Sequence, residues 1–360
     1  MRKNAFALSV VAGLLAWNAA VAALSSGCWE PSVKARIDEV IAQNQGNPDA
    51  YAVFDFDYTT AIGDLSLSCV WEMLETLDFR EGDFRSHVRL GLPERFRCEA
   101  EALADLADKL GGPRGAEMSR TPAWGVFARG YWKLFWAIHD TCGDPAVCRW
   151  RMGLFAGYEP AEMRRFAVRA TARALAFGGV VADRTVPTER RGMSLPQEMK
   201  ELFRALRAAG ISVYIVSGSS QEFLRAVTGD AFGLDVPPEC VFGVTYRLDE
   251  KGRFLPDEEE GGVTAGRKPE FIRAHIAPRH HGADPVLTGG DSMGDYAMLT
   301  GFRGLQAALV FPRDLGQQKM DALIASAPTS GGKVIVQGRD EPRGRFVPSC
   351  QSTYPPPGRP

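Results

Sequence analysis

Histidine and lysine are scarce in this 360-residue sequence, which contains five histidines and nine lysines. No Cys-x-x-Cys pair and no group of histidines at zinc-ligand spacing occurs, so a structural zinc module is excluded. The formal net charge is only −2, which excludes the electrostatic footprint of a nucleic-acid-binding protein. Periodic repeats and sustained heptads are also missing, so the chain is not a repeat or coiled-coil protein.

Long apolar runs are missing after the first 23 residues. At the start, Arg2 and Lys3 precede an apolar run over 5–17, and small residues follow up to Ala23. This layout predicts a signal peptide over 1–23 and export, to the periplasm of a bacterium. A retained anchor is the alternative, but the run is short and Asn18 interrupts it, so no stable membrane span is expected. Lipidation of Cys28, in a stretch that resembles a lipoprotein box, also stays open.

The hydrophobic pattern predicts an α/β fold with a Rossmann-like core and a mostly parallel sheet. Buried strands are expected at 51–57, 211–216, 286–288, 307–311 and 334–336, helices at 31–45 and 195–209, and a hairpin at 241–255. Residues 65–185 are helical in pattern and form an inserted cap, so the core comprises 24–64 and 186–345. Four prolines near the end predict a disordered tail over 346–360.

Seven cysteines follow the predicted cleavage site. Export favours disulfide bonds among them, because the bacterial periplasm is oxidising. Cys142 and Cys148 flank the turn-forming segment 143–145 and are the best candidate pair. The odd total leaves at least one thiol without a partner in the same chain.

Chemically active side chains recur at the ends of the predicted strands. The four stations are Asp55 with Asp57, then Ser217, then Lys268, then Asp291 with Asp295. Residues two apart on an extended strand face the same side, and Asp295 lies one helical turn after Asp291. If the four acids converge, they cannot all stay ionised without a cation, and oxygen ligands suit Mg²⁺. Thr59, Ser217, the Gly218 amide and Lys268 supply donors for an anion, which indicates phosphoryl chemistry.

These motifs resemble those of the haloacid-dehalogenase superfamily of phosphohydrolases. Residues 55–59 match D-x-D-x-T, 216–218 match an apolar strand ending in Ser, Lys268 matches the third motif, and 290–295 match G-D-x-x-x-D. The resemblance covers residues 50–312. The cap position is similar to that of phosphoserine-phosphatase-like members, and the chain loosely resembles the periplasmic phosphorylcholine-phosphatase branch.

The resemblance implies a role for each matching residue. Asp55 would be the nucleophile that forms an aspartyl-phosphate, and Asp57 would be the general acid and base. Asp55, the backbone carbonyl of Asp57 and Asp291 would hold Mg²⁺, with Asp295 acting around the metal. Ser217, Gly218 and Lys268 would bind the transferring phosphoryl group, and Thr59 would orient the loop. An acid at Asp57 favours phosphate-ester cleavage over dehalogenation, because a halide needs no proton when it leaves.

The resulting hypothesis is an exported Mg²⁺-dependent phosphomonoesterase acting on a small phosphate monoester. Cap aromatics such as Trp71, Trp124, Trp132, Trp136 and Trp150 either pack in the cap core or form a cage for a quaternary ammonium, as in phosphocholine. Most of the cap arginines are expected at the surface, but one could bind an acidic substrate such as phosphoserine. A phosphotransferase of the same fold and a non-catalytic ligand-binding protein remain the alternatives.

Overall fold

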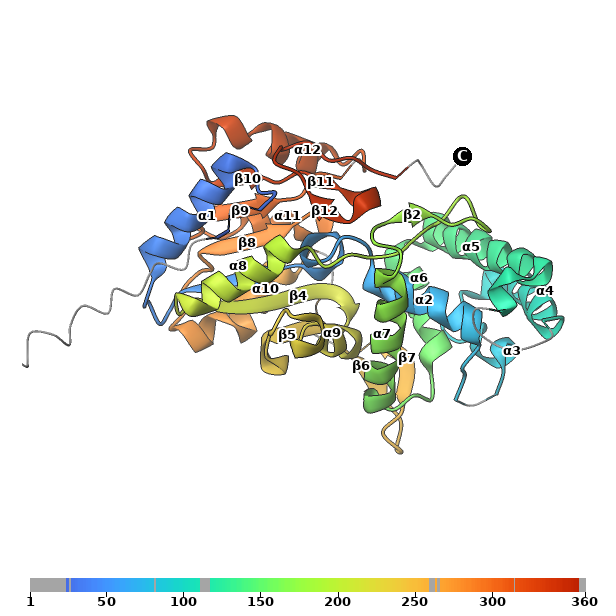
Figure 1. Ribbon diagram of the computed structural model, residues 1–360. Helices are drawn as coiled ribbons and strands as arrows, with labels where there is room; N and C mark the ends of the chain where they lie inside the picture. Colours follow the sequence, from blue (N-terminus) through green and yellow to red (C-terminus); the bar gives the residue numbers. More distant parts are fainter. Residues whose placement is uncertain are drawn as a thin grey trace, which may run out of the picture.

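The computed structural model describes residues 24–25, 27–80, 82–110, 117–258, 263, 266–313 and 315–355 (Figure 1). The predicted signal peptide over 1–23 lies outside these residues. Within them, no helix combines the length and the hydropathy that a membrane crossing requires.

Six parallel strands form a central sheet in the spatial order β10-β9-β8-β1-β4-β5. They are β1 (Tyr51–Phe54), β4 (Ser212–Ser220), β5 (Val241–Val244), β8 (Leu287–Gly290), β9 (Ala307–Val310) and β10 (Val334–Val336). All neighbouring pairs run parallel, and β1, β8 and β9 are buried throughout. Burial on both faces is typical of a parallel sheet between helical layers. The predicted α/β fold is confirmed.

Alternate side chains of β1 pack against two different helical layers. The helices of this body are α1 (Pro31–Asn44), α8 (Gln197–Ala208), α9 (Gln221–Val227), α10 (Lys268–His275), α11 (Met293–Thr300) and α12 (Gln318–Ala325). Ala52 and Phe54 share a hydrophobic cluster with α1 and α8, whereas Tyr51 and Val53 share another with α10 and α11. The alternation follows from the two-residue period of a strand. Helices α1 and α8 match the two helices predicted at 31–45 and 195–209.

Residues 65–191, between β1 and α8, form a separate helical body, at the right of Figure 1. Its helices are α2 (Leu65–Thr76), α3 (Phe84–His87), α4 (Arg97–Asp108), α5 (Pro122–Cys142), α6 (Asp144–Met152) and α7 (Pro160–Leu175), followed by the hairpin strands β2 (Val181–Ala182) and β3 (Arg190–Arg191). Trp124, Phe127, Tyr131 and Phe135 form one buried stripe on α5. This confirms that these aromatics pack in the interior of the cap, as their helical spacing predicts.

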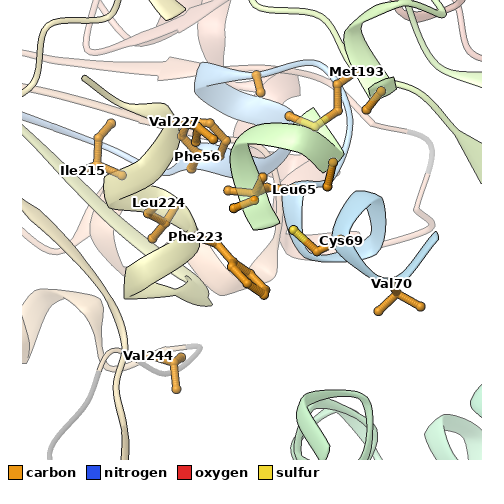
Figure 2. Close-up of a cluster of buried hydrophobic side chains, with 14 of the residues drawn as sticks. Phe56, Leu65, Cys69, Val70, Met193, Ile215, Phe223, Leu224, Val227 and Val244 are labelled. Carbon is orange, nitrogen blue, oxygen red and sulfur yellow. The ribbon is translucent and has the colours of Figure 1, made fainter. Parts of the chain in front are cut away.

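A hydrophobic cluster joins this helical body to the sheet (Figure 2). Phe56 comes from the loop after β1, Leu65 and Cys69 from α2, and Phe223 from α9, and all four are fully buried. The cluster therefore brings the start of the inserted segment close to the end of β4.

The hairpin of β6 (Tyr246–Leu248) and β7 (Phe254–Glu258) packs on the helical body rather than on the sheet. The backbone of Phe254 exchanges hydrogen bonds of 3.0 and 2.9 Å with Gly157 and Tyr158. The expected assignment of 186–345 to the core is therefore wrong for this hairpin. The predicted hairpin at 241–255 has the right turn, but its first residues form β5 of the main sheet.

Residues after β10 fold back onto the core. The strands β11 (Arg339–Asp340) and β12 (Arg345–Phe346) pair, and Phe346 is fully buried. The amide of Thr353 donates to the carbonyl of Arg339 at 2.7 Å. The predicted disorder over 346–360 is therefore wrong for 346–355, because a buried aromatic and backbone hydrogen bonds hold this segment. Residues 356–360 lie outside the described residues.

The expected bond between Cys142 and Cys148 is not formed in the structure. Gly143, with φ +81°, separates the exposed Cys142 at the end of α5 from α6, on which Cys148 lies. The proposed turn between the two cysteines is thus a junction of two helices.

Candidate active site

The predicted site residues lie at one edge of the sheet, where the parallel strands end. Asp55 follows β1, Ser217 lies in the last part of β4, and Asp291 follows β8. Lys268 is the first residue of α10, and Asp295 lies in the first turn of α11. Ligands bind beyond the carboxyl ends of strands in open α/β sheets, so this edge is the expected place for a site.

Three buried carboxylates form the centre of this site. Asp55, Asp291 and Asp295 each place one carboxylate oxygen within 4.8 Å of the others. Burial raises the pKa of Asp55 to about 6 and that of Asp291 to about 7, and the neighbouring acids contribute to both shifts. Acids that resist ionisation together gain from a cation among them, and an all-oxygen donor set suits a hard divalent metal ion.

Lys268 partly neutralises this cluster. Its ammonium donates to Asp55 Oδ1 at 2.7 Å and to Asp295 Oδ1 at 2.6 Å, and the side chain is 4% exposed. Burial alone would lower the pKa of Lys268, but Asp295 and Asp55 raise it above its ordinary value. The lysine therefore stays charged next to the carboxylates of Asp55 and Asp295.

The Asp57 carboxyl is not a member of the three-acid cluster and has its own hydrogen-bond partners. Its Oδ1 accepts the amide of Leu65 at 2.8 Å, and its Oδ2 accepts the hydroxyl of Ser219. Burial, Asp64 and Asp55 raise the pKa of Asp57 well above its ordinary value, although the two hydrogen bonds act in the opposite direction. The structure thus separates the two acids of the first motif, and the Asp57 side chain is not part of the predicted metal cluster.

The remaining predicted residues have different surroundings. Thr59 donates its hydroxyl to Asp291 Oδ1 at 3.1 Å, so it contacts a carboxylate of the cluster. Ser217 is buried, and its hydroxyl accepts the amide of Ser219 at 3.4 Å. Gly218 is exposed, and a Cβ there would meet nothing within 4 Å. The end of β4 at Gly218 therefore offers open space for an incoming anion.

Sequence reasoning missed three residues of the site. Ser219 contacts Asp57, and its place in the Ser-Gly-Ser segment at the end of β4 is the signal that could have found it. Arg313 donates to Asp291 Oδ2 at 3.0 Å and lies 3.5 Å from the ring centroid of Tyr58. It follows β9 at the same sheet edge, so a survey of every strand end would have included it. Arg339 donates to the Tyr58 carbonyl oxygen, and no local motif indicates this contact.

The cap aromatics do not face the site as a cage. Trp124, Trp132 and Trp150 are at most 1% exposed, and the guanidinium of Arg191 covers the ring of Trp71 at 4.7 Å. Trp136 is half-buried and donates to Glu189 at 2.6 Å. These five residues therefore build the interior of the cap and its polar margin.

Arg151 of α6 is the cap cation whose surroundings point toward the site. Its Nε is buried and has no hydrogen-bond partner among the described residues. Burial lowers the pKa of Arg151, but Cys148, Asp64, Tyr246 and Asp57 raise it, and the net shift is upward. The guanidinium is thus within electrostatic range of Asp64 and Asp57, the acids at the start of the cap.

The family model of the haloacid dehalogenase-like hydrolases matches residues 113–300, more than half of the chain. The protein belongs to this family. The matched range includes Ser217, Lys268, Asp291 and Asp295, whereas Asp55 precedes it. The resemblance inferred from the motifs is confirmed.

Two known proteins are informative for comparison. Phosphorylcholine phosphatase from Pseudomonas aeruginosa is 26% identical over 248 residues, which are 66% of this chain and 59% of that protein. The chain thus matches about three-fifths of the length of this curated relative. The crystal structure of a conserved protein of unknown function from Anaerococcus prevotii is similar with a TM-score of 0.79 and 24% identity, covering 92% of this chain and 98% of the other. This similarity shows that the two proteins share a fold.

Proposed function

We propose that the protein is a phosphoric monoester hydrolase that works through an aspartyl-phosphate on Asp55. The observation that carries the proposal is the division of the two acids of the first motif. Asp55 lies in the buried carboxylate cluster beside Lys268, whereas Asp57 is hydrogen-bonded to Leu65 and Ser219, and burial with Asp64 and Asp55 nearby raises its pKa. This division fits a reaction that needs one ionised nucleophile and one general acid.

In the first half of the reaction, a carboxylate oxygen of Asp55 attacks phosphorus. The bond from this oxygen to phosphorus forms while the bond from phosphorus to the substrate alcohol oxygen breaks. Asp57 gives its proton to the leaving alcohol, because an alkoxide is a poor leaving group at neutral pH. Lys268, the Ser217 hydroxyl and the Gly218 amide stabilise the negative charge on the transferring group.

In the second half, water attacks the aspartyl-phosphate. Asp57, now ionised, takes a proton from the water, inorganic phosphate leaves, and the carboxylate of Asp55 is regenerated. Asp55, Asp291 and Asp295 would hold Mg²⁺, with the backbone carbonyl of Asp57 as a further ligand. The metal ion, when bound, would supply charge neutralisation for the phosphoryl oxygens. Thr59 and Arg313 orient Asp291 for that role.

Replacement of the nucleophile tests this proposal. Asp55→Asn is expected to lower kcat for an aryl phosphate by about a thousandfold or more, because amide oxygen is a poor nucleophile. Asp230→Asn is a matched control, since Asp230 is exposed. Beryllofluoride with Mg²⁺ should bind the unmodified protein and fail to bind the Asp55→Asn variant. Near-normal turnover by Asp55→Asn would reject the assigned nucleophile.

The same chemistry on another acceptor would give a phosphotransferase. Its first half-reaction is identical, so the aspartyl-phosphate would not distinguish the two activities. Adding a short alcohol and measuring free phosphate against transferred phosphate separates them. We expect hydrolysis to dominate, because the open space at Gly218 leaves the site accessible to water. A ligand-binding protein without catalysis would show neither product.

The substrate is proposed to be a small phosphate monoester, either phosphocholine or an ester resembling phosphoserine. The Pseudomonas aeruginosa relative favours the first. Arg151 favours the second, because a buried cation near Asp57 would attract an anionic group in the leaving alcohol and repel a quaternary ammonium. Comparing kcat/KM for phosphocholine and phosphoserine decides between them.

The roles of the sheet body and the cap, and the cellular location of the protein, are also proposals. We assign catalysis to the sheet body and substrate selection to the cap of residues 65–185, to which the β6–β7 hairpin contributes. We further propose export to the bacterial periplasm, which the signal-peptide pattern over 1–23 supports. Mass spectrometry of the protein from a periplasmic fraction should find a mature chain that begins after Ala23. Retention of Met1 in cytoplasmic protein would contradict export.

A further inference from the structure

Two arginines from the last third of the chain, the buried Arg339 and the half-buried Arg313, contact Tyr58, which lies between Asp57 and Thr59. Arg339 donates from Nη1 to the carbonyl oxygen of Tyr58. The guanidinium of Arg313 lies over the Tyr58 ring, with 3.5 Å between its Cζ and the ring centroid. Tyr58, which separates Asp57 from Thr59, is thus contacted by one arginine on its backbone and by the other on its ring.

Tyr58 has an unusual backbone conformation. Its φ is +53°, a left-handed value that few residues other than glycine adopt. Its amide donates to the Gly63 carbonyl at 3.0 Å, which closes the loop on one side. The left-handed residue reverses the chain so that Asp57 and Thr59 make different contacts, one with Ser219 and the other with Asp291. A small rotation of this loop would therefore move both contacts.

Arg339 is itself held rigidly. Its side chain is fully buried, lies over the Phe311 ring at 4.9 Å, and donates to Glu341 at 3.2 Å. Glu341 is 1% exposed. A buried ion pair contributes little net stability because both charges lose their water. The pair nevertheless fixes the direction of the remaining guanidinium donors, and Nη1 is the donor that contacts the Tyr58 carbonyl.

We propose that Arg339 is a positioning residue that holds the Asp57–Thr59 loop in its working conformation. The C-terminal segment of β11 and β12 is therefore a functional part of the active site. This inference rests on the proposed function, because it assigns the loop its importance from the roles of Asp57 and Thr59. Arg313 adds a second contact to the same loop and joins it to Asp291.

The decisive variant removes the Tyr58 contact without leaving a buried charge. Arg339→Met with Glu341→Gln replaces both charges, so the fold should be retained. We expect kcat to fall about 10- to 100-fold with KM changed less than about threefold, and Mg²⁺ affinity, measured by calorimetry, to weaken about tenfold. Arg343→Met is the matched control, because Arg343 lies in the same turn and is 69% exposed.

The single variant Arg339→Lys provides a second test if the double variant fails to fold. Lysine keeps the charge beside Glu341 but lacks the fork that contacts both Glu341 and the Tyr58 carbonyl. A lower kcat with an unchanged KM and an unchanged melting temperature supports the inference. If kcat and Mg²⁺ affinity are unchanged in Arg339→Lys, or in a folded double variant, the positioning role of Arg339 is overturned.

The failure of this inference differs from the failure of the proposed function. If the unmodified protein hydrolyses phosphate monoesters and the Arg339 variants match it, only the positioning role is wrong. If the unmodified protein hydrolyses none of them, the proposed function is wrong, and the calorimetric Mg²⁺ titration of the Arg339 variants still tests the loop.

Discussion

The sheet body and the cap use charged residues in opposite ways. At the sheet edge, the Lys268–Asp295 pair has side-chain exposures of 4% and 1%. In the cap, Arg85 is 30% exposed and forms ion pairs with three acids at the surface: Glu101, Asp105 and Asp108. Water screens the cap pairs, whereas the buried pair interacts through a much lower effective dielectric.

The difference shows where each part of the molecule does its work. Buried charges at the sheet edge shift one another's pKa values, which is typical of functional sites. The surface charges on the cap are solvated by water, so their ion pairs contribute little to the stability of the fold. The cap also contains a buried acid, Glu75 at 2% exposure, which accepts from Arg173 and Arg191 and so joins α2 to α7 and β3. Four predictions test this division, from the largest expected effect to the smallest.

The largest effect should come from the proposed acid of the sheet body. Asp57→Asn is expected to lower kcat for an alkyl phosphate about 10²- to 10⁴-fold, because the leaving alkoxide receives no proton. The loss should be smaller for p-nitrophenyl phosphate, whose leaving group needs less protonation. Steady-state kinetics on the two esters measures this difference. Equal losses for both esters would contradict the role of Asp57 as general acid.

Removing a charge should cost more at the sheet edge than on the cap. Without metal, Lys268→Met leaves two buried acids without their cation, and the free energy of unfolding should fall by about 3 kcal/mol. Arg85→Met should leave the urea midpoint almost unchanged, because its partners are solvated. Urea unfolding in the presence of a chelator compares the two variants. A larger loss in Arg85→Met would reverse the division.

The cap should control selectivity rather than the chemical step. Arg151→Gln is expected to shift the ratio of kcat/KM for phosphoserine over phosphocholine by about tenfold toward phosphocholine, through the loss of one charge interaction. Arg97→Gln is the matched control, since Arg97 is 67% exposed on the cap. Kinetics with both esters gives the ratio. An unchanged ratio in Arg151→Gln would remove this residue from the substrate site.

The smallest effect concerns pH. Burial raises the pKa of Asp291 to about 7, so the folded metal-free protein binds a proton that the unfolded chain, with an ordinary pKa, releases near pH 4. The contribution of this Asp291 proton to the free energy of unfolding is fully present below pH 4 and is lost as the pH rises toward 7. Asp291→Asn should therefore stabilise the metal-free protein by about 1 kcal/mol at pH 7.5 and by less at pH 5. Urea unfolding at both pH values measures this, and an equal effect at both would contradict the shifted pKa.

The sequence predicts the sheet and most of the carboxylate site. Apolar runs mark β1, β4 and β8, and polar residues at their ends meet because the strands are parallel. Asp55 and Asp291 were therefore predictable as neighbours, whereas Lys268 begins α10 and does not follow a strand, so only its match to the third motif indicated it. Arg313 was also within reach of this argument, since it follows β9, whereas the separate environment of Asp57 depends on the turn at Tyr58.

The path of the chain outside the sheet was decided only by the tertiary structure. The β6–β7 hairpin packs on the cap, and the segment around Arg339 turns back beneath the first motif. No local pattern encodes these contacts, because they depend on which distant surface a short element finds for its backbone and side-chain partners. The ends of parallel strands converge because such strands all end at one edge of the sheet, and the strands can be recognised from the sequence. Arg339, in contrast, reaches Tyr58 across 281 positions, and this contact forms only when packing has fixed both segments.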